Sequence, residues 1–436
     1  MRRFCIAVST ILALTLALAA TAAAQTSESS DSETDESTVS VQTGEDTVWT
    51  LSARLRPRLE GRWNHRFGLK PGELNYLKTD QTDKFTNQTR IGAGLEAGDL
   101  TADLLLQHAA QWGTTGGDAL TDPPIDVHRA SFTWQPLDAW SLQLGRFEIA
   151  YGDQRVLGSV GWSQVGRSWD GLRTAIAPVD GLEFDLFGAR YTEGSVQQTP
   201  GFSGGFFEDD AFLTGLYASA GKELLGGLQA LDVYALYDIR LDRPTADVPL
   251  RRGLATLGSR VKGKWKPIDL TVEGAYQLGN RCVPGSGSAN CTDDTVDIAG
   301  WSIDSEVGAS FELPAKFRVF AGYARASGDN PDSSTDEAYR QLYPTGHKFL
   351  GFSDIVGPRT NIQQIRGGVS LKTGIVSIGE TAHHFTRLEP TVEGVGLEFD
   401  TTVGVNPSEH VTIQAGHALF VADEGFAKGD ASPSGM

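Results

Sequence analysis

The sequence is poor in cysteine and methionine, and it has too few basic residues to balance its acidic ones. The 436 residues include 3 cysteines and 2 methionines, and 37 Lys and Arg residues stand against 55 Asp and Glu residues, a net charge of -18. This balance argues against nucleic acid as a partner, because phosphate contacts need a basic face. After residue 24 no segment has enough consecutive apolar residues to cross a bilayer as a helix, which leaves a soluble chain or a β-barrel.

The amino terminus predicts export. Arg2 and Arg3 precede an apolar run of residues 6–20, and three alanines before Gln25 form a small-residue cleavage site. We therefore assign residues 1–24 to a Sec signal peptide. Residues 25–47 are acidic and rich in Ser and Thr, and they contain too few apolar residues to order themselves, which predicts a disordered leader.

The few cysteines fit an oxidising compartment. Cys5 lies within the signal peptide, and Cys282 and Cys291 flank a short loop rich in Gly, Ser and Pro. We expect these two thiols to form one disulfide that holds the loop. A metal site is not expected there, because two thiols without a nearby His make a poor zinc shell.

A period of two residues repeats from Trp49 to Phe420. In the segment 268–278, Ile, Leu, Val and Tyr on one face alternate with Asp, Thr, Glu and Gln on the other, and segments 301–313 and 395–405 behave alike. Short turns such as Gly98-Asp99 and Lys266-Pro267 alternate with long connections. Alternation over about ten residues, with short turns at one end and long loops at the other, is typical of an outer-membrane β-barrel.

The number of alternating segments is odd. About seventeen can be counted, whereas bacterial barrels made from one chain have an even number of strands. Either the leader supplies the closing strand, or the chain is truncated or frameshifted after Phe420; the non-alternating end of the sequence favours the second explanation. The predicted fold class is all-β: a transmembrane antiparallel β-barrel over residues 48–421, eighteen-stranded by design with its last strand missing, followed by an irregular tail at 422–436.

Basic residues gather on the predicted inner face of several strands. Alternation places them there at Arg54, Arg56, Arg58, Arg62, Arg90, Arg129, Arg173, Arg260, Lys262, Lys264 and Arg366. Such a cationic lumen would lower the barrier for an anionic solute. Alternatively, these side chains pair with the inward acids Glu60, Glu96, Asp103 and Glu183 and brace the wall. The two interpretations are compatible, and the sequence leaves both open.

Motifs of enzymes and nucleotide sites are lacking. The adjacent His383 and His384 point to opposite faces of a strand, and neither they nor His347 belong to an HExxH pattern. There is no GxSxG motif, and the glycine-rich stretch 113–117 lacks the Lys-Ser/Thr end of a phosphate-binding loop. We predict that the protein is not an enzyme and needs no metal and no cofactor.

Two blocks resemble a known family. LGRFEIAYGDQRVLGSVGWSQVGRSWDGLR (residues 144–173) closely resembles the signature of the alginate-export family of outer-membrane porins. YPTGHKFLGFSD (residues 343–354), followed by residues 361–371, is similar to a second recurring block of that family. The similarity extends over most of the chain, from about Trp49 to Phe420. It implies an eighteen-stranded barrel with a narrow, arginine-rich constriction that passes an anionic polyuronate.

The resemblance also implies which residues frame the path. These are Arg129, Arg146, Arg155, Arg167, Arg173 and Arg366, and the inward alternation adds Arg56, Arg58 and Arg90. A guanidinium group suits a sugar carboxylate because it can bind both oxygens. The long connections 150–168 and 329–358 are candidates to fold inward and gate the opening.

The predicted function is passive diffusion or export of an anionic saccharide such as alginate across the bacterial outer membrane. The expected partners are outer-membrane lipid, an anionic oligo- or polysaccharide and the barrel assembly machinery, with no nucleic acid. Alternatives are a general or other-solute porin, and a non-conducting structural barrel or adhesin. A barrel enzyme, which would carry a Ser/His pair at its rim, is the least favoured alternative.

Overall fold

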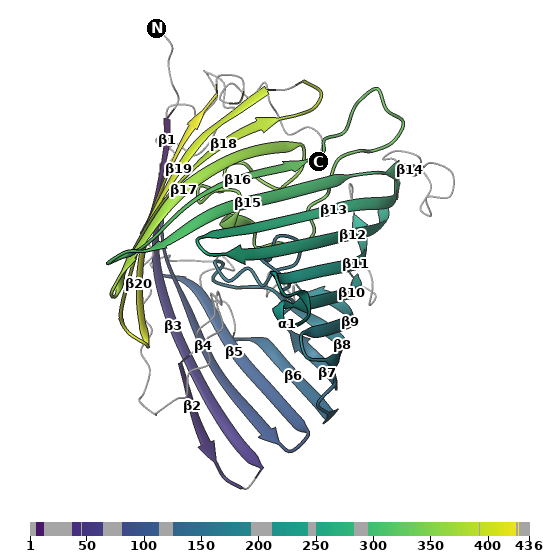
Figure 1. The fold of residues 1–436 in the computed structure, drawn as a ribbon, viewed down its shortest axis with the longest axis vertical. Coiled ribbons are helices and arrows are strands. Elements are labelled where there is room, and N and C mark those ends of the chain that lie inside the picture. The colour runs from purple at the N-terminus through teal and green to yellow at the C-terminus, as the bar shows by residue number, and fades with distance from the viewer. Residues whose placement is uncertain are drawn as a thin grey trace.

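The computed structural model describes residues 6–12, 37–44, 46–63, 81–112, 125–192, 212–242, 250–282, 295–391, 393–423 and 426. In these ranges twenty strands form one sheet that closes on itself, as Figure 1 shows. Each pairing is antiparallel, and strands that follow one another along the chain are in nearly every case neighbours in the sheet. No helix in the described ranges has the length and apolar character needed to cross a membrane.

The strands have the following bounds. In the first part of the chain they are β1 (Ile6–Leu12), β2 (Ser37–Gln42), β3 (Thr47–Trp63), β4 (Gln81–Ala97), β5 (Leu100–Trp112), β6 (Asp126–Leu137), β7 (Trp140–Phe147), β8 (Ser168–Val179), β9 (Leu182–Thr192) and β10 (Phe212–Gly221). After the short helix α1 (Lys222–Leu225) they are β11 (Leu228–Asp242), β12 (Leu250–Trp265), β13 (Ile268–Cys282), β14 (Thr295–Ile298), β15 (Trp301–Glu312), β16 (Lys316–Ala326), β17 (Ile362–Thr373), β18 (Val376–Arg387), β19 (Glu393–Ser408) and β20 (Val411–Ala422). A 3-10 turn, η1 (Gly346–Lys348), lies between β16 and β17.

The twenty strands fill eighteen positions around the barrel. β14 and β15 both pair with β13, one beyond the other, and β1 and β2 both pair with the same edge of β3. β1 also pairs with β20, so it closes the ring. The closing position is therefore occupied by β1, which lies before the leader, whereas β2 of the leader pairs with β3 and not with β20.

The leader is more ordered than its composition predicts. Ser37–Gln42 pairs with Val48–Ala53 of β3, so the prediction of disorder is wrong for this part of 25–47. Val39 and Val41 alternate with polar residues, and the edge of β3 offers unpaired backbone groups to them. β1 lies in the segment predicted as the export signal. Cys291 and most of the predicted tail lie outside the described residues, so the disulfide with Cys282 stays a prediction.

The two faces of the wall differ as the alternation predicts. On β12 the side chain of Leu257 is 50% exposed on the outer face, whereas its neighbour Thr256 is fully buried on the inner face. Thr256 lies opposite Gln277 of β13, whose Nε2 donates a hydrogen bond to the Thr256 Oγ1 at 3.2 Å. Apolar side chains thus point outward and polar ones point into the lumen, which is the arrangement of a barrel surrounded by lipid.

Two long connections lie inside the barrel. We call residues 148–167, between β7 and β8, loop L1, and residues 327–361, between β16 and β17, loop L2. Each supplies residues to a buried apolar cluster: Leu157 and Tyr343 join one around Trp169, and Tyr339 and Leu350 join one around Phe385. The hydrophobic core therefore sits in the lumen, between the loops and the inner wall, which confirms that these connections fold inward.

A charge placed on the outer face of β12 tests whether that face contacts lipid. We expect Leu257→Arg to lower the free energy of unfolding in lipid vesicles by about 2–4 kcal/mol, because the guanidinium would enter the hydrocarbon layer. Leu257→Met, which keeps the side chain apolar, should cost less than about 1.5 kcal/mol. Urea unfolding of both variants measures the difference, and equal costs would contradict the lipid-facing assignment.

Candidate functional site

The two blocks that resemble the known family meet in the lumen. Leu157 of L1 and Tyr343 of L2 form a parallel β-bridge. The Gly158 N–H donates to the Tyr343 carbonyl at 2.8 Å, and the Tyr343 N–H donates to the Val156 carbonyl at 3.0 Å. Arg167 braces this junction, because its Nη1 donates to the Gly158 carbonyl at 3.0 Å and also to the Tyr343 carbonyl. L1 and L2 are thereby joined into one unit.

On one side, L1 is bound to β3. The Arg56 guanidinium donates to the Gly161 carbonyl at 2.6 Å and to Gln164 Oε1 at 2.9 Å. Arg58 donates to the Trp162 carbonyl at 2.5 Å, and its Cζ lies 4.7 Å from the centre of the Trp162 ring. Both arginines are buried, so they act here as braces for backbone that has no strand partner of its own.

On the other side, L1 reaches β12. Asp153 Oδ1 lies 2.9 Å from Arg260 Nη1, and Tyr151 stacks on Tyr217 of β10 with ring centres 4.2 Å apart. β3 and β12 are nine strand positions apart in a ring of eighteen, which places them on opposite walls. L1 therefore crosses the lumen. Burial of the Tyr151 hydroxyl raises its pKa, so this side chain stays neutral.

The most concentrated charge in the described lumen surrounds Asp304 of β15. Its carboxylate lies 2.9 Å from Arg155 Nη1 of L1, 3.0 Å from Arg359 Nη2 of L2 and 2.8 Å from Arg366 Nη2 of β17. The Asp304 side chain is 1% exposed. Three guanidinium groups thus share one buried carboxylate, and two further acids offset part of the surplus positive charge: Glu306, 3.3 Å from Arg366, and Glu273, which interacts with Arg155 and Arg359.

Arg155 is the arginine of this cluster that has an unpaired hydrogen-bond donor among the described residues. Burial lowers its pKa, and although Asp304 opposes this shift, the nearby Arg366 and Arg359 add to it. The Arg155 Nε–H has no hydrogen-bond partner among the described residues. A carboxylate that approached Arg155 would therefore relieve repulsion between cations and satisfy an unpaired donor.

L2 has its own attachments to the wall. The Tyr343 Oη donates to Asp238 of β11 at 2.7 Å, and the Ser353 Oγ donates to Glu398 of β19 at 2.7 Å. His347 stacks on Trp162 of L1 with ring centres 4.1 Å apart, and its Nδ1 lies 2.9 Å from Asp354 Oδ1. L2 is held at several strands, so the unit of L1 and L2 is fixed around much of the barrel.

The ends of L1 are joined by a buried polar cluster. His128 Nε2 lies 2.6 Å from Glu148 Oε1 and 3.0 Å from Arg90 Nη2, and His128 Nδ1 lies 3.1 Å from Ser168 Oγ. Burial raises the pKa of Glu148, but the hydrogen bond with His128 and the charge of Arg90 outweigh it and lower the pKa overall. The Ser168 and His128 pair is buried in the wall, and it fixes the first residue of L1 to the strand that follows L1.

The predicted path residues have different surroundings. Arg56, Arg58, Arg90, Arg155, Arg167 and Arg366 lie in the lumen, as described above. Arg129 pairs with Asp103 at 2.9 Å, and Arg173 with Asp185; both pairs are on the inner face, and both arginines are partly exposed. The alternative that inward acids pair with inward arginines therefore holds at Asp103 and also at Glu60, which lies 2.5 Å from Arg58 Nε.

Arg146 departs from the prediction. It lies opposite Asp170 in the β7–β8 register, and the neighbouring outward residues are Leu144 and Leu172, which are 58% and 45% exposed. The side chain of Arg146 is therefore on the outer face of the barrel, outside the lumen, and its assignment to the path is corrected. The period of two, which puts Arg146 on the same face as Leu144, already carried this information.

Other functional residues were missed. Asp304 falls on the polar face of an alternating segment, so its inward orientation was readable, but its three partners were not. Arg359 lies in a loop without periodicity and gave no signal. In the described part of the chain no three His, Cys, Asp or Glu side chains are placed to hold a metal ion.

Comparison with known proteins identifies the family. Residues 126–389 match the model of the family described as alginate export. The chain belongs to the alginate export family. The matched region contains both blocks that meet in the lumen, and it is narrower than the range from Trp49 to Phe420 over which the resemblance was expected. A search of curated proteins finds no match.

Solved structures of the same fold come from Pseudomonas aeruginosa. OccK9 (OpdG) is 14% identical, with 87% of this chain and 98% of that chain covered and a TM-score of 0.54. OpdK with vanillate is 12% identical, with 86% and 98% covered and a TM-score of 0.53. OccK2 (OpdF) in complex with glucuronate is 11% identical, with 87% and 96% covered and a TM-score of 0.52. This member of the alginate export family is a β-barrel channel of the bacterial outer membrane.

If Asp304 holds L1 and L2 in place, removing its charge should loosen both loops. Asp304→Asn leaves three buried guanidinium groups without their shared charge, and breaking such a buried network costs about 3–5 kcal/mol. We expect faster trypsin cleavage at Arg155 and Arg359 and a loss of unfolding free energy of that size, measured by limited proteolysis and urea unfolding.

The matched control is Asp269→Asn. Asp269 pairs with Arg318 at 2.6 Å on the wall, where both side chains are about a quarter exposed, and its ion pair does not involve L1 or L2. It should cost about 1 kcal/mol or less and leave cleavage of the loops unchanged. Equal cleavage of the two variants would show that Asp304 does not hold the loops.

Proposed function

We propose that this channel passes an anionic saccharide, such as alginate, by passive diffusion or export through the lumen around L1 and L2. The observation that carries the proposal is the cluster of Arg155, Arg359 and Arg366 on one buried carboxylate. Two of these arginines lie on the loops inside the barrel, Arg155 on L1 and Arg359 on L2, and the third lies on the wall at β17. Such a charge attracts an anion most strongly at the narrowest level of a pore.

For conduction, the solute must also dissociate readily from this site. Arg366 and Arg359 already bind Asp304, so a passing carboxylate competes with a carboxylate of the protein and is held weakly. Arg155 is buried, and its Nε–H is unpaired among the described residues, so it offers an unused donor once a carboxylate reaches the cluster. Weak, exchangeable contacts of this kind are what conduction requires, because a tightly bound solute would block the pore.

The chemistry of similar proteins supports an acidic solute. The structural relative OccK2 (OpdF) was solved in complex with glucuronate, a sugar acid, and OpdK with vanillate, an aromatic acid. Identity of 11–12% carries only the fold, so the solute of this chain is argued from its own arginines. A second candidate is a channel for small single acids, and the crossing of the lumen by L1 favours it, since a crossed lumen suits a small solute.

The proposal predicts the behaviour of Arg155→Gln in planar bilayers. Removing this charge should lower the affinity with which oligomeric alginate blocks the current by about 10- to 150-fold, the effect of losing one charge-assisted hydrogen bond of about 1.5–3 kcal/mol. The anion selectivity, measured as the reversal potential in a salt gradient, should fall with it.

Arg129→Gln is the matched control, because Arg129 is an inner-face arginine whose ion pair with Asp103 at 2.9 Å involves neither the loops nor the Asp304 cluster. Selectivity and block should stay close to those of the wild type. Block by glucuronate but not by oligomeric alginate would favour the second candidate. Wild-type currents that neither solute affects would contradict both, and a closed barrel without currents would support the structural alternative.

A further inference from the structure

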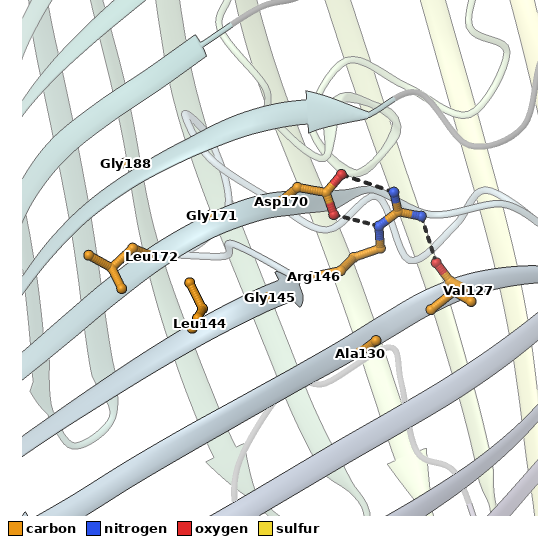
Figure 2. A pocket seen from close by; sticks show the side chains of 9 residues that line it. All are labelled: Val127, Ala130, Leu144, Gly145, Arg146, Asp170, Gly171, Leu172 and Gly188. Carbon is orange, nitrogen blue, oxygen red and sulfur yellow. Dashed lines mark hydrogen bonds and ion pairs between the residues drawn. The ribbon is translucent and has the colours of Figure 1, made fainter. Parts of the chain in front are cut away.

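A cleft opens on the outer face of the barrel, over four neighbouring strands. It has a volume of ≈ 590 Å³ and is formed by residues of β6, β7, β8 and β9, as Figure 2 shows. Its floor is made of residues with little or no side chain, namely Ala130, Gly145, Gly171 and Gly188. Of these four, Ala130 and Gly188 are at outward positions, opposite Arg146 and Leu172 in the register, so the outer surface lacks a large side chain there.

The rims of the cleft are apolar and exposed. Leu144 and Leu172 are 58% and 45% exposed, and Phe132 on β6 and Leu186 on β9 continue this surface at 45% and 56%. On the inner face of the same strands, Trp169 and Phe187 are 1% and 3% exposed. The cleft therefore belongs to the lipid-facing surface of an outer-membrane barrel, so its surroundings are acyl chains rather than water.

A polar pair closes one end. Arg146 binds Asp170 through both carboxylate oxygens, with Nε–Oδ1 at 2.7 Å and Nη2–Oδ2 at 2.9 Å, and its Nη1 donates to the Val127 carbonyl at 2.9 Å (Figure 2). These bonds use three of the five N–H groups of the guanidinium, so donors remain for an outside acceptor. The pair lies where L1 leaves β7, at the end that carries long loops, which in such barrels faces the outer leaflet.

We propose that this cleft is a binding site for a lipid of the outer leaflet. One acyl chain lies in the groove beside Leu144 and Leu172, over Ala130 and Gly188, and the ester or head-group oxygens of the lipid accept hydrogen bonds from Arg146. An amphiphile matches this surface because the groove is apolar along its length and offers hydrogen-bond donors at its outer end. The proposal concerns the outside of the barrel and does not depend on the solute proposed for the lumen.

Photolabelling of the wild-type protein tests the site without any substitution. The protein is placed in lipid nanodiscs with phosphatidylethanolamine that carries a diazirine in its acyl chain, and the adducts are mapped by mass spectrometry. We expect labelling at Leu144 and Leu172 to exceed that at Val233 and Leu257, which are similarly exposed on β11 and β12, by about tenfold, because a held chain stays against its site. Uniform labelling would overturn the proposal.

Filling the cleft gives a second, independent test. A Cβ on Gly188 would meet only the Thr214 Cγ2, at 3.7 Å, so Gly188→Leu fits the backbone and occupies the groove. The control Gly274→Leu lies on the outer face of β13, where a Cβ would meet only the Ser302 carbonyl oxygen, also at 3.7 Å. Gly188→Leu should abolish the preferential labelling and Gly274→Leu should keep it, with the conductance of both unchanged.

Equal labelling of the two variants would overturn the proposal. So would a dimer in native mass spectra that Gly188→Leu abolishes, because the cleft would then be an interface between copies of the chain. Heat-dependent migration in gels confirms that each variant has folded before it is compared.

Discussion

The carboxylate of Asp304 is the interaction on which the interior of this barrel depends. It binds guanidinium groups from L1, from L2 and from β17, with all three distances at or below 3.0 Å. A lone cation buried at this depth would be costly, so each arginine is tolerated because the acid is there. The same arrangement leaves positive charge in excess. The arginines that hold the loops in place therefore also set the charge inside the barrel. The attachment of both loops to the wall at β15 therefore depends on one carboxylate.

The two loops also explain why a channel contains a hydrophobic core. A hydrated lumen gives a long loop no reason to stay folded inward, since backbone groups are equally well bonded by water. Here Trp169, Tyr191 and Tyr343 pack together, and Arg56 and Arg167 bind loop carbonyls that no strand pairs. The arginines thus divide into those that hold backbone and those that meet another charge. The second group, around Asp304, is the one suited to meet a solute.

The charged side chains of β7 and β8 have different partners on the inner and the outer face of the barrel. Arg173 points inward, where it meets Asp185 and the ring of Tyr151, while Arg146 and Asp170 form a bidentate pair toward the membrane. A charge on the lipid face is tolerated near the interface and in a pair, where its cost falls to about 0–1 kcal/mol. Next to Leu172 in the register, Gly188 leaves the outer surface without a large side chain.

Much of this protein was predictable from its sequence. The period of two gave the barrel and the inward face of Arg56, Arg58, Arg90 and Arg366, because each strand needs only its own residues to be apolar outside and polar inside. The blocks at 144–173 and 343–354 indicated the family that the comparison then showed. What only the tertiary structure decided depends on segments far apart in the chain: the closure of the ring by β1, the junction of Leu157 with Tyr343, and the partners of Asp304. A local pattern states which face a side chain occupies, but which charges meet inside a closed barrel is set by the closure itself.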